Sequence, residues 1–348
     1  MRRARVRDAG QPSALRPLVE VDDLTKRFGA RGGLSQILGA ASQRQLTAVD
    51  AVSFQINAGE ILGLVGESGS GKTTLGRCLL RLVEPSSGQV RFDGRDLIAL
   101  SKGDLRVARR QMQMIFQDPY SALNPRMTIR QMLSEVLRFH RICTDAAIPA
   151  RIAELLALVG LDQSAADRLP RHFSGGQRQR IGIARALAVE PRFIVADEPV
   201  SAVDVSVQAQ IMNLLLDLRD QLGLTILLIA HDLSVVRYVS DRVGVLYLGR
   251  LVEIAPRAQI FATPRHPYTQ ALLRAAPRPD PDRQSAQPAI AGEPPSPLNP
   301  PPGCHFHTRC PLATARCKSE MPPLQTVSDG HQVRCHHHDL ALLNPLPR

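Results

Sequence analysis

The chain has 348 residues, of which 44% are hydrophobic and 22% are charged, and its formal net charge is +11. This composition indicates a globular protein of about two domains with a large core. No run approaches the roughly 18 apolar residues that a membrane span needs. The basic opening, Met1 to Arg7, leads into no apolar stretch. We therefore expect neither a membrane span nor a secretory signal, and we predict a cytoplasmic protein.

The positive charge is compatible with nucleic acid, with an anionic membrane surface or with phosphate ligands. The chain contains no tryptophan, and aromatic residues make up only 4% of it. That content disfavours a platform on which bases stack. We expect no nucleic-acid partner.

In chain order, residues 1–16 are typical of a disordered basic tail. Leu18 to Leu24 predicts a strand, and Thr47 to Ile56 predicts a second one. Between them, Gly29 to Arg44 is rich in glycine, serine and alanine and indicates an inserted loop or short helix. Gly88 to Gly94 predicts a strand that ends in an Asp-Gly turn.

The stretch Glu60 to Val65 is a short apolar strand followed by a glycine-rich loop and a helical pattern. The loop matches the P-loop pattern G-x-x-x-x-G-K-[ST], whose glycines let backbone N–H groups face an anion at a helix N-terminus. Lys72 can reach the β- and γ-phosphates of a nucleotide, and the Thr73 hydroxyl can ligate Mg²⁺. The predicted nucleotide-binding residues are Gly66, Glu67, Ser68, Gly69, Ser70, Gly71, Lys72, Thr73 and Thr74.

From Ser101 to Val189 the pattern is largely helical. Two apolar strands follow, Phe193 to Ala196 and Thr225 to Ala230, with an amphipathic helix from Val207 to Leu222 between them. Strands that alternate with helices predict an α/β fold, in which helices cover both faces of a mainly parallel sheet.

Each of these two strands ends in residues that can act on a phosphate. Asp197 follows the first strand and is placed to hold Mg²⁺ beside a P-loop. The adjacent Glu198 can orient or deprotonate an attacking water. His231 follows the second strand and can hydrogen-bond the γ-phosphate or that water, although a purely structural histidine is the alternative.

The sequence Ser174-Gly175-Gly176-Gln177 opens another helix. Ser174 is a natural N-cap, and the glycines leave N–H groups free to face an anion. One nucleotide does not need two such loops from one chain. We therefore predict that two copies pair head to tail, each supplying this loop to the nucleotide of the other.

Together these motifs resemble the ATP-binding cassette (ABC) ATPases, in family order, over roughly residues 18–260. Phe173 stands where the family more often has leucine, and Val203 replaces another leucine. Phe28 is similar to the aromatic residue that stacks on adenine, and a core phenylalanine is the alternative. The matched motifs are the Walker A loop at Gly66 to Thr73, the Q-loop at Gln117, the signature loop at Ser174 to Gln177, the Walker B strand at Phe193 to Asp197, the catalytic glutamate at Glu198, the D-loop at Ser201 to Asp204 and the switch histidine at His231.

The resemblance implies an ABC cassette: a RecA-like mixed-sheet core of residues 17–104 and 190–260 and a helical subdomain of residues 105–189. A small cysteine-rich C-terminal region of residues 261–348 follows. ATP and Mg²⁺ are the implied cofactors, with Thr73, Gln117 and Asp197 around the metal. Glu198, His231 and Gln117 are the implied catalytic residues.

Gln117 to Arg126, Pro264 to Leu273 and Gly303 to Pro311 are similar to the oligopeptide and dipeptide importers. The insertion between Phe28 and Thr47 is similar to their second, "F"-type ATPase subunit. The resemblance implies a peripheral subunit on the cytoplasmic side of the membrane. Its implied partners are a second ATPase, either a copy or a paralogue, two permease subunits and, indirectly, an extracytoplasmic solute-binding protein. Nickel or another small solute remains an alternative cargo, and a cytosolic ABC ATPase without a transport role is a more distant alternative.

Cys304, Cys310, Cys317 and Cys335 lie beyond the proline-rich stretch Pro277 to Gly303. A reducing compartment disfavours disulfides, and the spacings are wider than those of usual zinc sites. The resemblance implies a [4Fe–4S] cluster. Zinc remains an alternative because histidines lie nearby in the sequence. Thiols that bind no ligand are the other alternative. We expect the cluster to be structural or redox-sensing and to have no part in hydrolysis.

Overall fold

The computed structural model describes residues 17–29, 45–118, 123–201, 204–275 and 292–339. The predicted tail of residues 1–16 lies outside the described residues. So do most of the insertion after Phe28, residues 119–122 after the Q-loop, Ala202 and Val203 of the D-loop, and residues 277–291 of the proline-rich stretch.

In the described part of the chain, the larger sheet has eight strands in the order β11-β12-β10-β9-β3-β8-β7-β6. From β9 to β6 the neighbours are parallel, whereas β10, β12 and β11 pair antiparallel. Every residue of β3, β7 and β8 is buried, as expected for central parallel strands. The bounds are Ile61–Val65 (β3), Met112–Ile115 (β6), Phe193–Asp197 (β7), Thr225–Ile229 (β8), Arg242–Tyr247 (β9), Arg250–Pro256 (β10), Gln325–Ser328 (β11) and His331–Val333 (β12).

A smaller antiparallel sheet has the order β2-β1-β4-β5. The strands predicted at Leu18 to Leu24, Thr47 to Ile56 and Gly88 to Gly94 are confirmed as β1, β2 and β4. Asp93-Gly94 forms the predicted turn between β4 and β5. Leu75 and Leu79 of α1 belong to the same core as Val52 and Val90 of this sheet and Val195 of β7. Helix α1 is therefore held between the two sheets. The bounds are Pro17–Phe28 (β1), Leu46–Asn57 (β2), Ser87–Phe92 (β4), Arg95–Asp96 (β5) and Lys72–Leu79 (α1).

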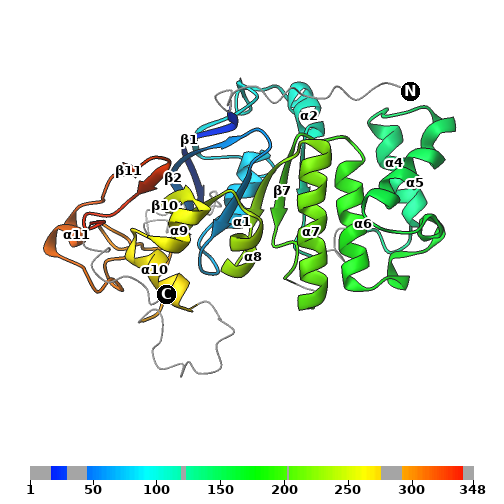
Figure 1. The fold of residues 1–348 in the computed structure, drawn as a ribbon. Helices are drawn as coiled ribbons and strands as arrows, with labels where there is room; N and C mark the ends of the chain where they lie inside the picture. The colour runs from blue at the N-terminus through cyan, green and yellow to red at the C-terminus, as the bar shows by residue number, and fades with distance from the viewer. Residues whose placement is uncertain (1–16, 30–44, 119–122, 202–203, 276–291, 340–348) are drawn as a thin grey trace, which may run out of the picture.

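The predicted helical stretch from Ser101 to Val189 is confirmed with one exception. Met112–Ile115 forms strand β6, which pairs with β7 at the end of the larger sheet. Figure 1 shows α4, α5, α6 and α7 on one side of the molecule and α9, α10 and α11 on the other. The helices are Lys102–Arg110 (α2), Ile129–Phe139 (α4), Ile148–Leu158 (α5), Gly175–Leu187 (α6), Val205–Leu222 (α7), Leu233–Val239 (α8), Arg257–Ala262 (α9), Pro267–Ala275 (α10) and Ala315–Ser319 (α11), with short 3₁₀ turns at Asp145–Ala147, Gln163–Asp167 and Pro170–His172.

The C-terminal segment is built into the larger sheet, because β12 pairs with β10. The pairing is anchored by Glu253 of β10, which is fully buried and lies 2.7 Å from the ring nitrogen of His331. The same carboxylate accepts the backbone N–H groups of Arg265 and His266 at 2.6 and 3.0 Å. These contacts give the buried charge the partners it needs. The division at residue 261 stays a prediction. No helix among the described residues has the length and apolar character that a membrane crossing requires.

Candidate functional site

The predicted P-loop joins β3 to α1, as its pattern indicates. Gly66 and Gly71 have φ of 153° and 103°, a region that L side chains rarely adopt. A Cβ atom at Gly66 would lie 2.1 Å from the carbonyl oxygen of Leu246, and one at Gly71 would lie 2.0 Å from that of Ala48. Both positions therefore require glycine, for close backbone approach as well as for conformation. Residues 66–71 wrap around the N-terminus of α1.

Lys72 closes this loop. Its Nζ donates to the carbonyl oxygens of Gly66 and Glu67 at 2.8 and 2.9 Å and to the Ser70 hydroxyl at 3.3 Å. The residue is only 5% exposed. Burial lowers the pKa of Lys72, and the nearby carboxylates of Glu198 and Asp197 act in the opposite direction. A buried ammonium that is satisfied mainly by neutral carbonyls can accept an anion such as a phosphate.

Asp197, the last residue of β7, meets the start of α1. Its Oδ1 accepts the Thr73 hydroxyl at 2.8 Å, across 124 residues of sequence. The side chain is buried, and burial raises the pKa of Asp197. A hydroxyl and a carboxylate beside a phosphate-binding loop are the oxygen donors that Mg²⁺ accepts. This donor set fits the predicted metal.

Gln117, Glu198 and His231 follow β6, β7 and β8, which are neighbours in the sheet, so their side chains meet at one edge. The Gln117 amide Nε2 donates to Glu198 Oε2 at 2.6 Å, and the His231 Nδ1 lies 3.7 Å from the same oxygen. Glu198 has a φ of 44°. A left-handed non-glycine residue costs about 1–2 kcal/mol, and the Glu198 N–H is held by the Ile229 carbonyl at 2.9 Å. In this backbone conformation the Glu198 carboxylate faces both Gln117 and His231.

The predicted second anion-binding loop, Ser174 to Gln177, forms the N-terminus of α6 with Ser174 as the N-cap residue. The Ser174 hydroxyl accepts the Gln177 N–H at 3.3 Å, and the Gln177 side chain accepts the Ser174 N–H at 3.1 Å. This capping box starts α6 at Gly175. Both side chains bond locally and leave Gly175 partly exposed at the helix N-terminus.

Phe28, the predicted adenine-stacking residue, ends β1 and is 40% exposed. The Lys26 ammonium lies 4.8 Å from the centre of its ring. The exposed ring face is available to a flat ligand, and the stacking role stays a prediction.

Cys304, Cys310, Cys317 and Cys335 line one small cavity, together with Phe306 and Leu312. All four are free thiols. Burial raises the pKa of Cys310 to about 11 and that of Cys335 to about 12. Within the described ranges, no three His, Cys, Asp or Glu side chains are grouped so as to hold one metal ion. The cysteines thus converge on a common space without forming a site for a single ion.

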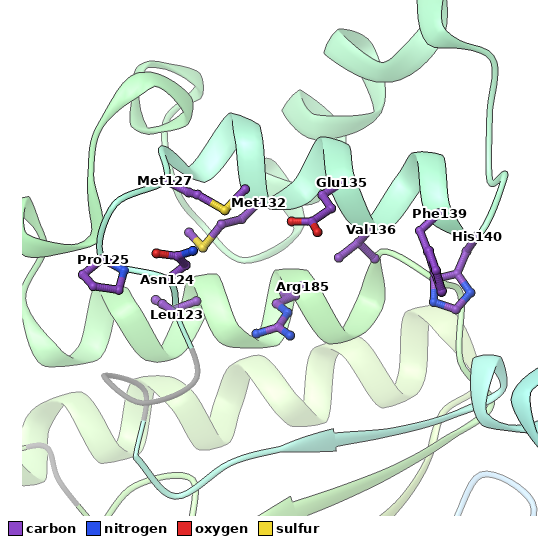
Figure 2. Close-up of a pocket in the computed structure, with 10 residues that line it drawn as sticks. All are labelled: Leu123, Asn124, Pro125, Met127, Met132, Glu135, Val136, Phe139, His140 and Arg185. Atoms are coloured by element: carbon purple, nitrogen blue, oxygen red, sulfur yellow. The ribbon is translucent and has the colours of Figure 1, made fainter.

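A groove of about 570 Å³ lies between α4 and α6. Figure 2 shows Met132, Glu135 and Val136 of α4 facing Arg185 of α6, with Leu123 to Pro125 at one end. Phe139 at the end of α4 is 60% exposed, with the Arg106 guanidinium 4.4 Å above its ring. Sequence analysis did not predict this groove, since it forms between helices that are distant in the chain.

Two family profiles match the chain. One, described as "ABC transporter", covers residues 49–201, and the other, "Oligopeptide/dipeptide transporter, C-terminal region", covers residues 252–317. A putative peptide import ATP-binding protein of Brucella ovis is 53% identical over 92% of this chain and 97% of its own length. The oligopeptide transport ATP-binding protein AppF of Bacillus subtilis is 48% identical over 92% and 97%.

The chain belongs to the ABC transporter ATP-binding family.

Solved ABC cassettes share its fold. One is a dimer of the cassette MJ0796, in a post-hydrolysis state bound to ADP and Pi, with a TM-score of 0.59 and 28% identity over 69% of this chain and 98% of that one. Another is cbiO1 of Clostridium perfringens, with the same TM-score and 25% identity over 70% and 90%. The predicted fold class of an ABC cassette is confirmed.

We predict that Glu198→Gln leaves ATP binding intact but lowers kcat for ATP hydrolysis by about 100-fold or more, the usual contribution of a general base. The amide keeps the shape and the contact with Gln117 but cannot accept a proton. Equilibrium binding of labelled ATP and single-turnover hydrolysis separate the two effects. Hydrolysis at the wild-type rate would remove Glu198 from the reaction.

Proposed function

We propose that this chain is the ATP-hydrolysing subunit of an ABC importer that takes up di- or oligopeptides. The observation that carries the proposal is one continuous chain that matches both the ABC transporter profile and the oligopeptide/dipeptide C-terminal profile. The names of its relatives in Brucella and Bacillus support the same cargo class. Nickel or another small solute is the alternative that uptake measurements would detect.

The residues at the end of β3 would bind the ATP phosphates. Backbone N–H groups of residues 66–74 and the N-terminus of α1 favour an anion, and Lys72 adds a full positive charge. Thr73 and Asp197 would hold Mg²⁺, with Gln117 completing the set. When bound, the metal neutralises charge on the β- and γ-phosphates. Phe28 would stack on the adenine.

Glu198 would take the proton from the attacking water. Its Oε2 lies 2.6 Å from the Gln117 amide and 3.7 Å from His231 Nδ1, so the three side chains share one small volume. Gln117 would fix the carboxylate, and His231 would hydrogen-bond the γ-phosphate or the water. Since Gln117 also begins the segment that leads to the α4–α6 groove, it is the proposed link between hydrolysis and transport.

Ser174, Gly175, Gly176 and Gln177 would complete the ATP site of a second cassette. The capping box presents the positive N-terminal end of α6 with Gly175 partly exposed. A dimer in which each chain supplies this loop to the other would close on two ATP molecules and reopen after hydrolysis. The difference in ATP affinity between the two states supplies the coupling. The second subunit is either a copy or a paralogue.

The α4–α6 groove is the proposed contact for the two permease subunits, which would hold this chain at the cytoplasmic face of the membrane. A groove lined by both apolar and polar side chains, with Glu135 and Arg185 on facing helices, suits a short amphipathic helix of a permease loop. Leu123, which lines the groove, lies six positions after Gln117 in the chain, so the groove and the ATP site are close in sequence. An extracytoplasmic solute-binding protein would deliver the peptide, and no nucleic acid is involved.

The C-terminal cysteines would hold a [4Fe–4S] cluster, with zinc as the alternative. The convergence of four thiols on one cavity supports a shared ligand. Their spacing in the sequence is wider than that of usual zinc sites and favours a cluster over a single ion. Because burial raises the pKa of Cys310 and of Cys335, binding would have to displace the protons of these two thiols.

We predict that the chain, co-expressed with its permease subunits, co-purifies with them from detergent-solubilised membranes, and that Phe139→Glu abolishes this co-purification. The change places a charge in an exposed apolar contact and leaves the ATP site untouched. Leu222→Glu, at an exposed position at the end of α7, is the matched control. Uptake of labelled peptides, compared with uptake of nickel, then identifies the cargo. Full co-purification of Phe139→Glu would place the permease elsewhere.

We predict that the signature loop acts in trans. Gly175→Asp places a negative charge beside the phosphate of the partner, so dimers carrying it lose activity by about tenfold or more, as 1.4 kcal/mol or more would cause. Gly182→Asp, on the same helix in open space, is the control. Dimers of two tagged copies are made with Gly175→Asp and Glu198→Gln either in different subunits or in the same subunit. If the loop acts in trans, the first arrangement damages one ATP site and the second damages both. Higher activity of the second arrangement would refute the pairing.

We predict that anaerobically purified protein is brown and contains iron and sulfide in equal amounts, and that Cys310→Ser loses the colour. The measurements are absorbance and metal analysis. Cys143→Ser, outside the cavity, is the control. Colourless protein with one zinc per chain would transfer the site to zinc.

A further inference from the structure

One residue of the P-loop, Glu67, is held at every polar group it has. Its carbonyl accepts Lys72 Nζ at 2.9 Å, within the loop. Its backbone N–H donates to the Tyr268 hydroxyl at 2.8 Å, across 201 residues. Its carboxylate receives both terminal nitrogens of Arg309, Nη1 at 2.8 Å and Nη2 at 3.0 Å, across 242 residues. Two of the three anchors therefore come from outside the cassette motifs.

The ion pair is built to be rigid. A fork-shaped, two-bond arginine–carboxylate pair is the strongest of the ordinary side-chain ion pairs. The Arg309 side chain is 5% exposed, and that of Glu67 is 25% exposed. Nη1 also reaches the Tyr247 hydroxyl at 3.4 Å. Tyr247 and Tyr268 are both buried in the core, so the contacts around Glu67 and Arg309 do not depend on flexible surface groups.

Arg309 sits in the cysteine-bearing segment, next to Cys310. The segment is tied into compact turns by the Cys304 N–H, which donates to the Cys317 carbonyl at 2.8 Å, and by the Arg309 N–H, which donates to the Phe306 carbonyl at 3.0 Å. The Phe306 ring packs against Tyr247 and Tyr268, with centroids 5.3 Å from each. The segment therefore rests on Tyr268, whose hydroxyl holds the P-loop, and on Tyr247, whose hydroxyl contacts Arg309.

Charge gives the contact a consequence for nucleotide binding. Glu67 carries a negative charge at the entrance of a loop whose proposed ligand is a polyphosphate. An unpaired carboxylate at this point would repel the phosphates and could swing into the loop. Arg309 neutralises the charge and holds the carboxylate in a two-bond contact with its own guanidinium.

We propose that the segment of residues 303–317 is a clamp on the phosphate-binding loop, with Arg309 as the positioning residue that sets ATP affinity through Glu67. Arg309 contacts no reacting atom. The segment that carries three of the four predicted cluster cysteines is thereby coupled to the ATP site through nucleotide binding. The inference rests on the proposed ATPase function and deepens it, because it makes the state of the cysteine segment a determinant of nucleotide affinity.

The test compares wild type, Arg309→Ala and Arg309→Lys. We expect Arg309→Ala to raise Kd and KM for ATP by about tenfold or more, as loss of one partner of a desolvated charge pair does, with kcat within about twofold. Arg309→Lys keeps the charge and should recover part of the affinity. Arg316→Ala is the matched control: Arg316 makes the same two-bond pair in the same segment, with Glu320, but the side chain is 60% exposed and bonds to no P-loop residue. It should bind ATP like wild type.

A double variant shows whether Arg309 acts through Glu67. Arg309→Ala combined with Glu67→Ala removes the stranded carboxylate and should bind ATP more tightly than Arg309→Ala alone. Arg309→Gln breaks the ion pair without emptying the buried position, so it tests the idea even if Arg309→Ala does not fold. Unchanged Kd and KM in Arg309→Ala or Arg309→Gln, or losses that simply add in the double variant, would overturn the clamp. Wild-type protein that binds no ATP would instead overturn the proposed function.

Discussion

The parallel pairing of β3, β8, β7 and β6 is the constraint on which the rest of the site depends. Parallel neighbours end at the same edge of a sheet, so the residues after each strand meet although they lie up to about 165 positions apart in the chain. The P-loop follows β3, Glu198 follows β7, and His231 follows β8. Each of these strands is buried on both faces. The surrounding core therefore holds the strands, and the residues at their ends, in fixed positions.

The phosphate site is pre-formed by compensation. Burying the Lys72 ammonium without partners would cost free energy. The carbonyl oxygens of Gly66 and Glu67 accept hydrogen bonds from it. Glu198 would repel Asp197, and Gln117 donates to it. Each of these charges has a neutral partner, and an anionic phosphate can replace the carbonyl partners of Lys72. Such preorganisation reduces the reorganisation that binding requires.

Local patterns predicted most of this site. The strand, glycine loop and helix around Lys72 are contiguous, and so is the capping box of Ser174 and Gln177, so their chemistry is readable without any long-range contact. Strand β6 was missed because four residues are too few to show a period, and its pairing with β7 comes from tertiary structure. Strand β9 and the antiparallel strands β10, β12 and β11 were not predicted either. Arg309 and Tyr268 carry no local signal, because their role exists only where they meet Glu67.

The long-range contact between Glu67 and Arg309 also bears on synthesis. At about 5–20 residues per second, a ribosome needs tens of seconds or less to pass from the P-loop to the C-terminal clamp. Over that interval β3 and α1 have already emerged, but the carboxylate of Glu67 has no counter-ion and β10 has no β12 beside it. The contacts of Glu67 are complete only when the segment of residues 303–317 docks. A chain interrupted before that point keeps its Walker A sequence but lacks the Arg309 ion pair.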